Sequence, residues 1–278
     1  MMKWTRFKIV FLVAVLFPAA AWAKTSLTLI AFDQLAASGH PVWIKVRLVS
    51  GSLAPRPVSG ERIEFRDGDR LLSQSLSGGD GLASARFTPP RAGLHVISVR
   101  LADNPRYEAE PSELILESRA GGAPILIHLS SIQASSRPPA VPFSPAPSPE
   151  AMPEAAAVLK EISGRQPIVF LEWGPEGMWP RTRDWLTNED FPKAPLWIWT
   201  LPPSGRADRL TERLDEIRRT GFGAVSTVIT GSVADAEEFS SLGLRVILVS
   251  EDEEGAGLPA GVRRTTVWKG IPALLKRP

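Results

Sequence analysis

The stretch PIVFLEWGPEGMWPRTRDWL, residues Pro167–Leu186, decides how the second half of the chain folds. Within it, residues 168–171 form an apolar run with the length of a strand that is buried on both faces. Gly174 and Gly177 then break this pattern, and Pro180 stands where a following helix would begin. A strand, a loop and a helix in this order make half of a βαβ unit.

The same alternation continues over residues 125–278 and predicts an α/β domain. Because the expected strands are apolar along their whole length, they belong in a parallel sheet with helices on both faces, a three-layer arrangement. Residues 135–153 are rich in Pro, Ser and Ala and predict an irregular loop. The expected strands are 125–129, 167–171, 195–200, 224–230 and 245–250, and the expected helices are 154–163, 181–186, 206–220 and 232–242.

Residues 24–118 predict an all-β domain instead. In the stretch 41–49, apolar residues such as Val42 alternate with residues such as Trp43, a pattern typical of a half-buried strand. About seven such short strands separated by turn signals are typical of an immunoglobulin-like sandwich. The run DGLASARFTPPRAGLHVISV, residues 80–99, resembles bacterial immunoglobulin-like domains of secreted and surface proteins. This resemblance implies a fold and no particular ligand.

Residues 1–23 have the pattern of a Sec-type bacterial signal peptide. A positively charged start is followed by a short apolar core and by an A-x-A-like cleavage site, Ala21-Trp22-Ala23. The apolar run is short for a membrane span, and an uncleaved N-terminal anchor is the alternative. We therefore expect a periplasmic or secreted protein that has no transmembrane span after cleavage. Residues 119–124 predict a linker between the two domains.

Composition narrows the function classes. The 278 residues suffice for two domains of about 150 residues each. The net charge of +2 becomes slightly negative once the three basic residues of the signal segment are removed, so nothing electrostatic predicts nucleic-acid binding. The chain has no cysteine, which excludes disulfides, thiolate catalysis and cysteine-based metal sites.

Two blocks of the α/β region resemble the haloacid dehalogenase-like phosphatases, most closely their lipin-like or phosphatidate-phosphatase branch. The blocks are LEWGPEGMWPRTRDWL, residues 171–186, and FGAVSTVITGSVADAEEFSSLGL, residues 222–244. The resemblance spans about residues 123–249 and implies a Rossmannoid sheet that hydrolyses phosphoesters. Such a site uses a nucleophilic Asp on the first strand, a second Asp as acid/base, a hydroxyl and a Lys that hold phosphoryl oxygens, and acidic ligands for Mg²⁺.

This chain departs from that pattern at the reacting positions. The nucleophile position falls on His128 and the acid/base position on Ser130. The position of the phosphate-binding hydroxyl falls on Glu172, whose charge would repel a phosphate. The Lys position falls near Leu210, with Arg209 one residue away. These departures predict a degenerate site with no confident catalytic residue.

Of the acidic residues that hold the metal in that family, only Asp235 remains. A lone carboxylate holds Mg²⁺ poorly, and residues 121–148 contain no Asp or Glu that another alignment could use. We therefore expect no metal and no cofactor, with Mg²⁺ required only if the chain is a hydrolase. Asp235 also follows Ser232 at the spacing of a helix capping box, which is its structural alternative. Residues 251–254 predict a solvated loop, with a Ca²⁺ site as the alternative.

Several other side chains have a functional and a structural interpretation. His128 could replace the nucleophile or be a hydrogen-bonded structural residue. Trp173 and Trp179 are expected in the loop above the rim of the sheet, where they are candidates for binding a ligand. Arg181 and Arg183 either clamp an anion or form the solvated face of a helix.

These patterns favour an exported, non-catalytic pseudo-phosphatase with a binding or adaptor role in the cell envelope. Its partner would be a protein or a small molecule, not a nucleic acid. One alternative is an atypical hydrolase of phosphate or phospholipid substrates. Another is a ligand-binding module that uses the Trp-lined loop.

Overall fold

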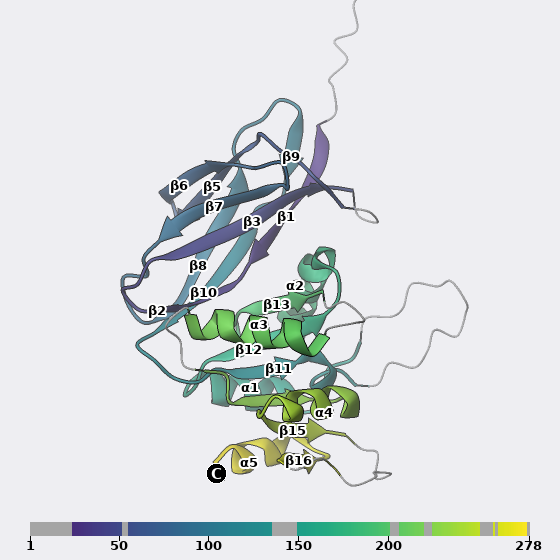
Figure 1. The fold of residues 1–278 in the computed structure, drawn as a ribbon. Helices are drawn as coiled ribbons and strands as arrows, with labels where there is room; N and C mark the ends of the chain where they lie inside the picture. The colour runs from purple at the N-terminus through teal and green to yellow at the C-terminus, as the bar shows by residue number, and fades with distance from the viewer. Residues whose placement is uncertain are drawn as a thin grey trace, which may run out of the picture.

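The computed structural model describes residues 24–51, 55–134, 149–200, 206–219, 224–250, 258 and 261–276. Within these ranges the chain forms a β-sandwich and an α/β part that lie against each other (Figure 1). The expected signal peptide and residues 251–254 lie outside the described residues. No helix in the described part of the chain is long and apolar enough to cross a bilayer.

The sandwich is built from two five-stranded sheets. Its strands are β1 (Thr25–Phe32), β2 (Gln34–Ala37), β3 (Val42–Ser50), β4 (Arg56–Pro57), β5 (Arg62–Asp67), β6 (Arg70–Leu76), β7 (Leu82–Phe87), β8 (Gly93–Leu101), β9 (Tyr107–Ala109) and β10 (Ser112–Arg119). One sheet has the order β4-β3-β1-β9, with β7 also paired to β3, and the other has the order β2-β10-β8-β5-β6. The chain therefore changes sheets between β1 and β2, at the single residue Asp33.

Strand β3 confirms the expected alternation. Its inward residues Ile44, Val46 and Leu48 are fully buried, whereas Trp43 is 58% exposed. Four strands of the sandwich were not predicted, namely β2, β4, β6 and β9. Three of these are no longer than four residues, too short to show a period, and β6 is half-buried or exposed along its whole length.

The second part contains one six-stranded sheet in which every pairing is parallel. The strand order β13-β12-β11-β14-β15-β16 places the first strand of this part at the centre. The strands are β11 (Ile125–His128), β12 (Ile168–Trp173), β13 (Leu196–Trp199), β14 (Thr227–Thr230), β15 (Arg245–Val249) and β16 (Val262–Thr265). The helices are α1 (Ala155–Ser163), α2 (Trp179–Asn188), α3 (Arg206–Arg219), α4 (Val233–Ser241) and α5 (Ile271–Lys276).

Helices cover both faces of this sheet, which confirms a three-layer α/β arrangement. Successive strand residues alternate between two apolar clusters: Ile125 and Ile127 lie in one, and Leu126 lies in the other. The first cluster also receives α1, α2 and α5, and the second receives α3 and α4. Strand β16 and helix α5 follow residue 250 and were not predicted, because the strand carries two arginines and no apolar run.

The sandwich packs along the outer side of the edge strand β13 (Figure 1). The first apolar cluster contains sandwich residues such as Leu27 together with α2 residues such as Trp179, so one hydrophobic core crosses the junction. After β10, residues 120–124 join the two parts, and the Arg119 side chain donates to the carbonyls of Ser163 and Arg165. The two parts are thus joined by buried apolar surface as well as by the linker.

Candidate functional site

The strand order places a topological switch point between β11 and β14. From these two central strands the chain proceeds in opposite directions across the sheet, and ligands of open α/β sheets bind beyond the carboxyl ends at this point. Strand β11 ends at His128 and β14 ends at Thr230. The neighbouring strand β12 ends in Glu172 and Trp173, and Asp235 lies in the first turn of α4. We call this group the rim site.

His128 contacts two of the other expected residues through one ring nitrogen. Its Nδ1 lies 2.7 Å from Ser130 Oγ and 3.5 Å from Asp235 Oδ2. A Ser–His–Asp relay needs the hydroxyl and the carboxylate on opposite nitrogens of the ring. These three side chains therefore do not form such a relay. His128 and Asp235 are both buried.

The two loops that follow β11 and β14 touch each other. Ser130 Oγ accepts a hydrogen bond from the Gly231 backbone N–H at 2.9 Å and lies 3.3 Å from Thr230 Oγ1. A Cβ atom at Gly231 would stand 2.2 Å from the Ser130 carbonyl oxygen, so only glycine permits this approach. The Gly231 amide is the kind of donor that holds phosphate in other α/β folds, and here the Ser130 hydroxyl occupies it.

Trp173 covers this group from the side of β12. Its indole Nε1 donates to Asp235 Oδ1 at 3.1 Å, and its ring lies 5.1 Å from the His128 ring and stacks on Phe239. Asp235 also donates its backbone N–H to Ser232 Oγ at 3.3 Å, which confirms the helix cap expected at this position. The carboxylate of Asp235 is thus turned towards Trp173 and His128.

Glu172 adds a second carboxylate to the rim site. Its pKa is raised to about 7, mainly by burial and to a smaller extent by the nearby charge of Asp235, while a hydrogen bond from the Trp173 backbone N–H opposes the shift. Asp235 is therefore close enough for its charge to act on the Glu172 carboxyl group. A carboxyl group with this pKa can exchange a proton near neutral pH. In the described part of the chain, no three His, Asp or Glu side chains come together as a group that could hold a metal ion.

Two of the expected ligand-binding residues lie away from the rim site. Trp179 is the first residue of α2 and is buried towards the sandwich, not above the rim beside Trp173. Arg181 is exposed on the same helix. Arg183 was expected to lie in solvent or at an anion site, and the solvated interpretation is wrong. Its guanidinium lies over the Trp179 ring, 5.2 Å from the centroid, and forms a largely buried ion pair with Asp33.

Asp33, which the sequence analysis did not single out, joins the two parts of the molecule. Its Oδ1 accepts the Ile115 N–H of the sandwich at 2.7 Å, and its Oδ2 accepts the Leu196 N–H of β13 at 2.8 Å. Its backbone carbonyl accepts the indole N–H of Trp197 at 3.1 Å. Among these contacts, Asp33 satisfies the outward-facing N–H of Leu196 on the edge strand β13. We call Asp33 and these partners the junction site.

Burial also dominates the electrostatics of Asp33. Its side chain is fully buried, which raises its pKa to about 6 in spite of the charge of Arg183 and the hydrogen bonds from Ile115 and Leu196. A second ion pair, between Arg47 of β3 and Glu176 of the loop before α2, crosses the junction as well. No local sequence pattern announces such a contact, because its partners lie far apart in the chain.

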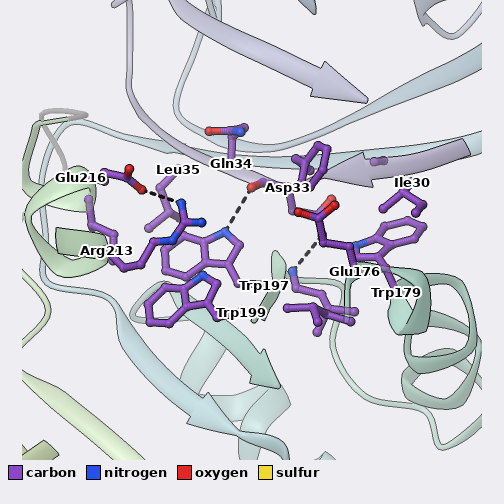
Figure 2. Close-up of a pocket in the computed structure, with 15 residues that line it drawn as sticks. Ile30, Asp33, Gln34, Leu35, Glu176, Trp179, Trp197, Trp199, Arg213 and Glu216 are labelled. Atoms are coloured by element: carbon purple, nitrogen blue, oxygen red, sulfur yellow. Dashed lines mark hydrogen bonds and ion pairs between the residues drawn. The ribbon is translucent and has the colours of Figure 1, made fainter. Parts of the chain in front are cut away.

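Two cavities lie at the junction. The first has a volume of about 180 Å³ and lies between the β1–β2 connection, the edge strand β13 and helix α3 (Figure 2). The second has a volume of about 670 Å³ and lies between β1, the start of β10 and helix α2. Trp179 lines both. Trp179, which was expected above the rim, thus lines cavities at the junction instead.

The chain matches no family model, and none of the curated proteins matches it. Among solved structures it is similar to the fibronectin(III)-like modules of Clostridium thermocellum CbhA, with 17% identity, a TM-score of 0.26, and 34% of this chain and 48% of that chain covered. It is also similar to the D0-D1 domain of intimin, with 20% identity, a TM-score of 0.21, and 32% and 45% covered. The CARDB domain of PF1109 from Pyrococcus furiosus shows 11% identity, a TM-score of 0.26, and 34% and 94% covered. This chain thus spans about half the length of the first two structures.

Proposed function

We propose that this chain is an exported, non-catalytic two-domain protein whose α/β part is a pseudo-phosphatase with a binding or adaptor role in the cell envelope. The observation that carries the proposal is the closure of the rim site on itself. Ser130, the Gly231 amide, Trp173 and Asp235 serve as hydrogen-bond partners for one another. A phosphoryl group would have to displace these contacts before it could bind.

The haloacid dehalogenase-like assignment is supported by residue placement together with strand order. The strand that carries the family's nucleophile position is β11, which lies at the centre of the sheet next to β14. His128, Glu172 and Asp235, which occupy three of the family's functional positions, come together at the carboxyl ends of the strands. Leu210, near the Lys position, is fully buried in the apolar cluster on one face of the sheet and offers no charge to a phosphate.

The chemistry at these positions favours binding over turnover. An imidazole at position 128 cannot form an aspartyl phosphate, and Glu172 places a carboxyl group where the family places a hydroxyl. Only when Glu172 is protonated does its repulsion of a phosphate disappear. The two carboxyl groups and one imidazole do not form a group that could hold Mg²⁺ among the described residues.

Hydrolysis assays test the proposal. The purified chain is incubated with p-nitrophenyl phosphate and with phosphatidate vesicles, with Mg²⁺ present. We expect release of phosphate at the rate of the buffer, and the same rate for Asp235→Ala. Magnesium-dependent turnover in the native chain that Asp235→Ala abolishes would contradict the proposal and support an enzyme.

Export is tested separately, because it depends on residues outside the described ranges. Expression of the full chain in a Gram-negative host, followed by fractionation and N-terminal sequencing, should give a periplasmic or secreted protein that begins at Lys24. Recovery of the intact N-terminus in the membrane fraction would indicate the uncleaved anchor instead.

A second candidate function, an atypical phosphoester hydrolase, is supported by the raised pKa of Glu172. A carboxyl group with a pKa of about 7 at the same sheet edge as the buried His128 is suited to general acid/base chemistry. If this function holds, phosphohistidine should be trapped on His128, and Glu172→Gln should remove the limb of the pH–rate profile near pH 7. An unchanged rate in His128→Ala would end this alternative.

A further inference from the structure

We propose that the smaller junction cavity binds one ring of a neutral saccharide. The cavity has a volume of about 180 Å³ and opens between the sandwich and the edge of the parallel sheet (Figure 2). One wall is the connection from Ile30 to Leu35, the floor is β13, and helix α3 closes one end with Arg213 and Glu216. This site deepens the proposed binding role. Its lining shares no residue with the rim site, although the ring of Trp199 lies 6.0 Å from the ring of Trp173.

The volume sets the size of the ligand. An apolar cavity of about 150 Å³ in a protein core holds one benzene molecule. A cavity of about 180 Å³ therefore accepts a single six-membered ring, with its substituents directed towards the opening. A nucleotide or a lipid chain exceeds this space.

Two tryptophans give the cavity a flat aromatic surface. Trp197 and Trp199 are two residues apart on β13, so their side chains lie on the same face of the sheet. Their rings stack with centroids 5.6 Å apart and an angle of 14° between the ring planes. The bond from Trp197 Nε1 to the Asp33 carbonyl holds the outer ring in place. Trp197 is only half-buried, whereas Trp199 is buried. A rigid indole face of this kind packs against the C–H faces of a sugar ring and needs no further ordering when it binds.

The charges around the cavity favour a neutral ligand. Each carboxylate of the lining is paired, Asp33 with Arg183, Glu176 with Arg47, and Glu216 with Arg213 at 2.8 Å. No lining carboxylate thus leaves an uncompensated charge, and an added phosphate would face three carboxylates. The paired carboxylates thus distinguish the junction cavity from the phosphate site that the family resemblance implies at the rim.

The polar groups favour a hydroxylated ring over an aromatic side chain. Glu176, Glu216 and Arg213 place acceptors and donors around the aromatic floor (Figure 2). Sugar hydroxyls can hydrogen-bond to these groups in place of the water that they displace. A purely apolar ring would exclude that water and leave part of their hydrogen-bonding capacity unused, which costs free energy.

Ligand-observed NMR with the full chain tests the proposal. The probes are the methyl glycosides of glucose, galactose, mannose and N-acetylglucosamine, with glucose 6-phosphate as an anionic probe and N-acetyltryptophanamide as an aromatic probe. We expect saturable binding of at least one neutral glycoside with a Kd on the order of 1 mM, as suits a ligand of this size. Glucose 6-phosphate and N-acetyltryptophanamide should bind at least tenfold more weakly.

Variants locate the binding. Trp197→Ala should weaken it about tenfold or more, and Trp43→Ala, which removes an exposed tryptophan of β3, should leave it unchanged. Trp197→Ala also removes the hydrogen bond to the Asp33 carbonyl and could disturb the junction. The exposed ion pair of Arg213 and Glu216 is therefore tested in parallel. Glu216→Gln and Arg213→Gln should keep the fold and weaken binding about threefold or more.

Three results would overturn the proposal: no saturable binding of any neutral glycoside, equal binding by the native chain and by Trp197→Ala, or tighter binding of the phosphorylated or the aromatic probe. These results leave the proposed pseudo-phosphatase role intact, because that role is decided by phosphate turnover at the rim site. Conversely, phosphatase activity would overturn the pseudo-phosphatase role without changing where a saccharide binds.

Discussion

The rim site and the junction site both hold a buried acid with a raised pKa, and they differ in what surrounds it. At the rim, Glu172 faces a second carboxylate, and its pKa rises to about 7. At the junction, Asp33 faces Arg183 and two backbone N–H groups, and its pKa still rises to about 6. Burial is the leading cause in both places. The partners therefore distinguish a site whose acid can exchange a proton near neutral pH from a site that holds the two parts of the molecule together.

This comparison predicts that the junction contributes more to stability than the rim. Asp33→Ala should lower the free energy of unfolding by about 3–5 kcal/mol, because it leaves Arg183 charged and buried and leaves two N–H groups without an acceptor. Denaturant titration measures the loss. The control Asp103→Ala removes a fully exposed carboxylate and should change stability by less than about 0.5 kcal/mol. Equal effects of the two substitutions would refute the assignment of the junction site.

The pH dependence of the unfolding free energy tests the raised pKa of Glu172. The folded pKa of Glu172 is about 7 and its ordinary value is 4.5, so the folded state binds the proton more tightly than the unfolded chain does. This group's stabilisation is complete below pH 4.5 and is lost as the pH rises to 7, up to roughly 3 kcal/mol. Asp33 contributes in the same direction between pH 3.8 and about 6.

Glu172→Gln should therefore flatten the fall in unfolding free energy over this window, most clearly between pH 6 and 7, where Asp33 contributes little. The exposed Glu108→Gln serves as the matched control and should keep the native slope. If Glu172→Gln and the native chain lose stability with the same slope, the raised pKa assigned to the rim acid is wrong.

The contact between the two rim loops gives a smaller effect. Gly231→Ala should destabilise the fold by about 1–3 kcal/mol, because the new Cβ meets the Ser130 carbonyl at 2.2 Å. Gly79→Ala, which meets no atom within 4 Å, is the control and should stay close to the native value. Thermal unfolding of the two variants compares them directly. A native-like Gly231→Ala would show that the loops can separate easily, as a working site would require.

The helix cap gives the smallest effect. Ser232→Ala should cost about 1 kcal/mol, because the Asp235 N–H loses its acceptor at the start of α4. Ser232→Asn keeps a capping side chain and should restore most of the loss in denaturant titrations. If the Asn variant does not restore stability, Ser232 stabilises the fold by some contact other than the helix cap.

Local patterns predicted most of the framework and only part of the sites. The alternation in β3 and the apolar run of β12 follow from burial, so both strands could be found from neighbouring residues. The strand pattern together with the family resemblance pointed to His128, Ser130 and Asp235 at the rim, where the structure brings them together. Their mutual hydrogen bonds could not be predicted, because these depend on side-chain rotation.

The junction was missed because its residues have no local signal. Asp33 stands alone in an apolar segment, and its partners Ile115, Arg183 and Leu196 lie 82, 150 and 163 residues away in the chain. Arg183 has the helical spacing of a solvated side chain, and only the sandwich that covers α2 buries it. Trp179 was placed at the rim for a similar reason, since its sequence position does not show which way helix α2 faces.

The central claim is that Ser130, the Gly231 amide, Trp173 and Asp235 satisfy one another and leave no place for a transferring phosphoryl group. Isothermal titration calorimetry with orthovanadate and Mg²⁺ tests it most directly, because vanadate imitates phosphoryl transfer whatever the substrate is. The account predicts no saturable heat in the native chain and no difference in Asp235→Ala. Saturable binding of vanadate that depends on Mg²⁺ and disappears in Asp235→Ala would contradict it.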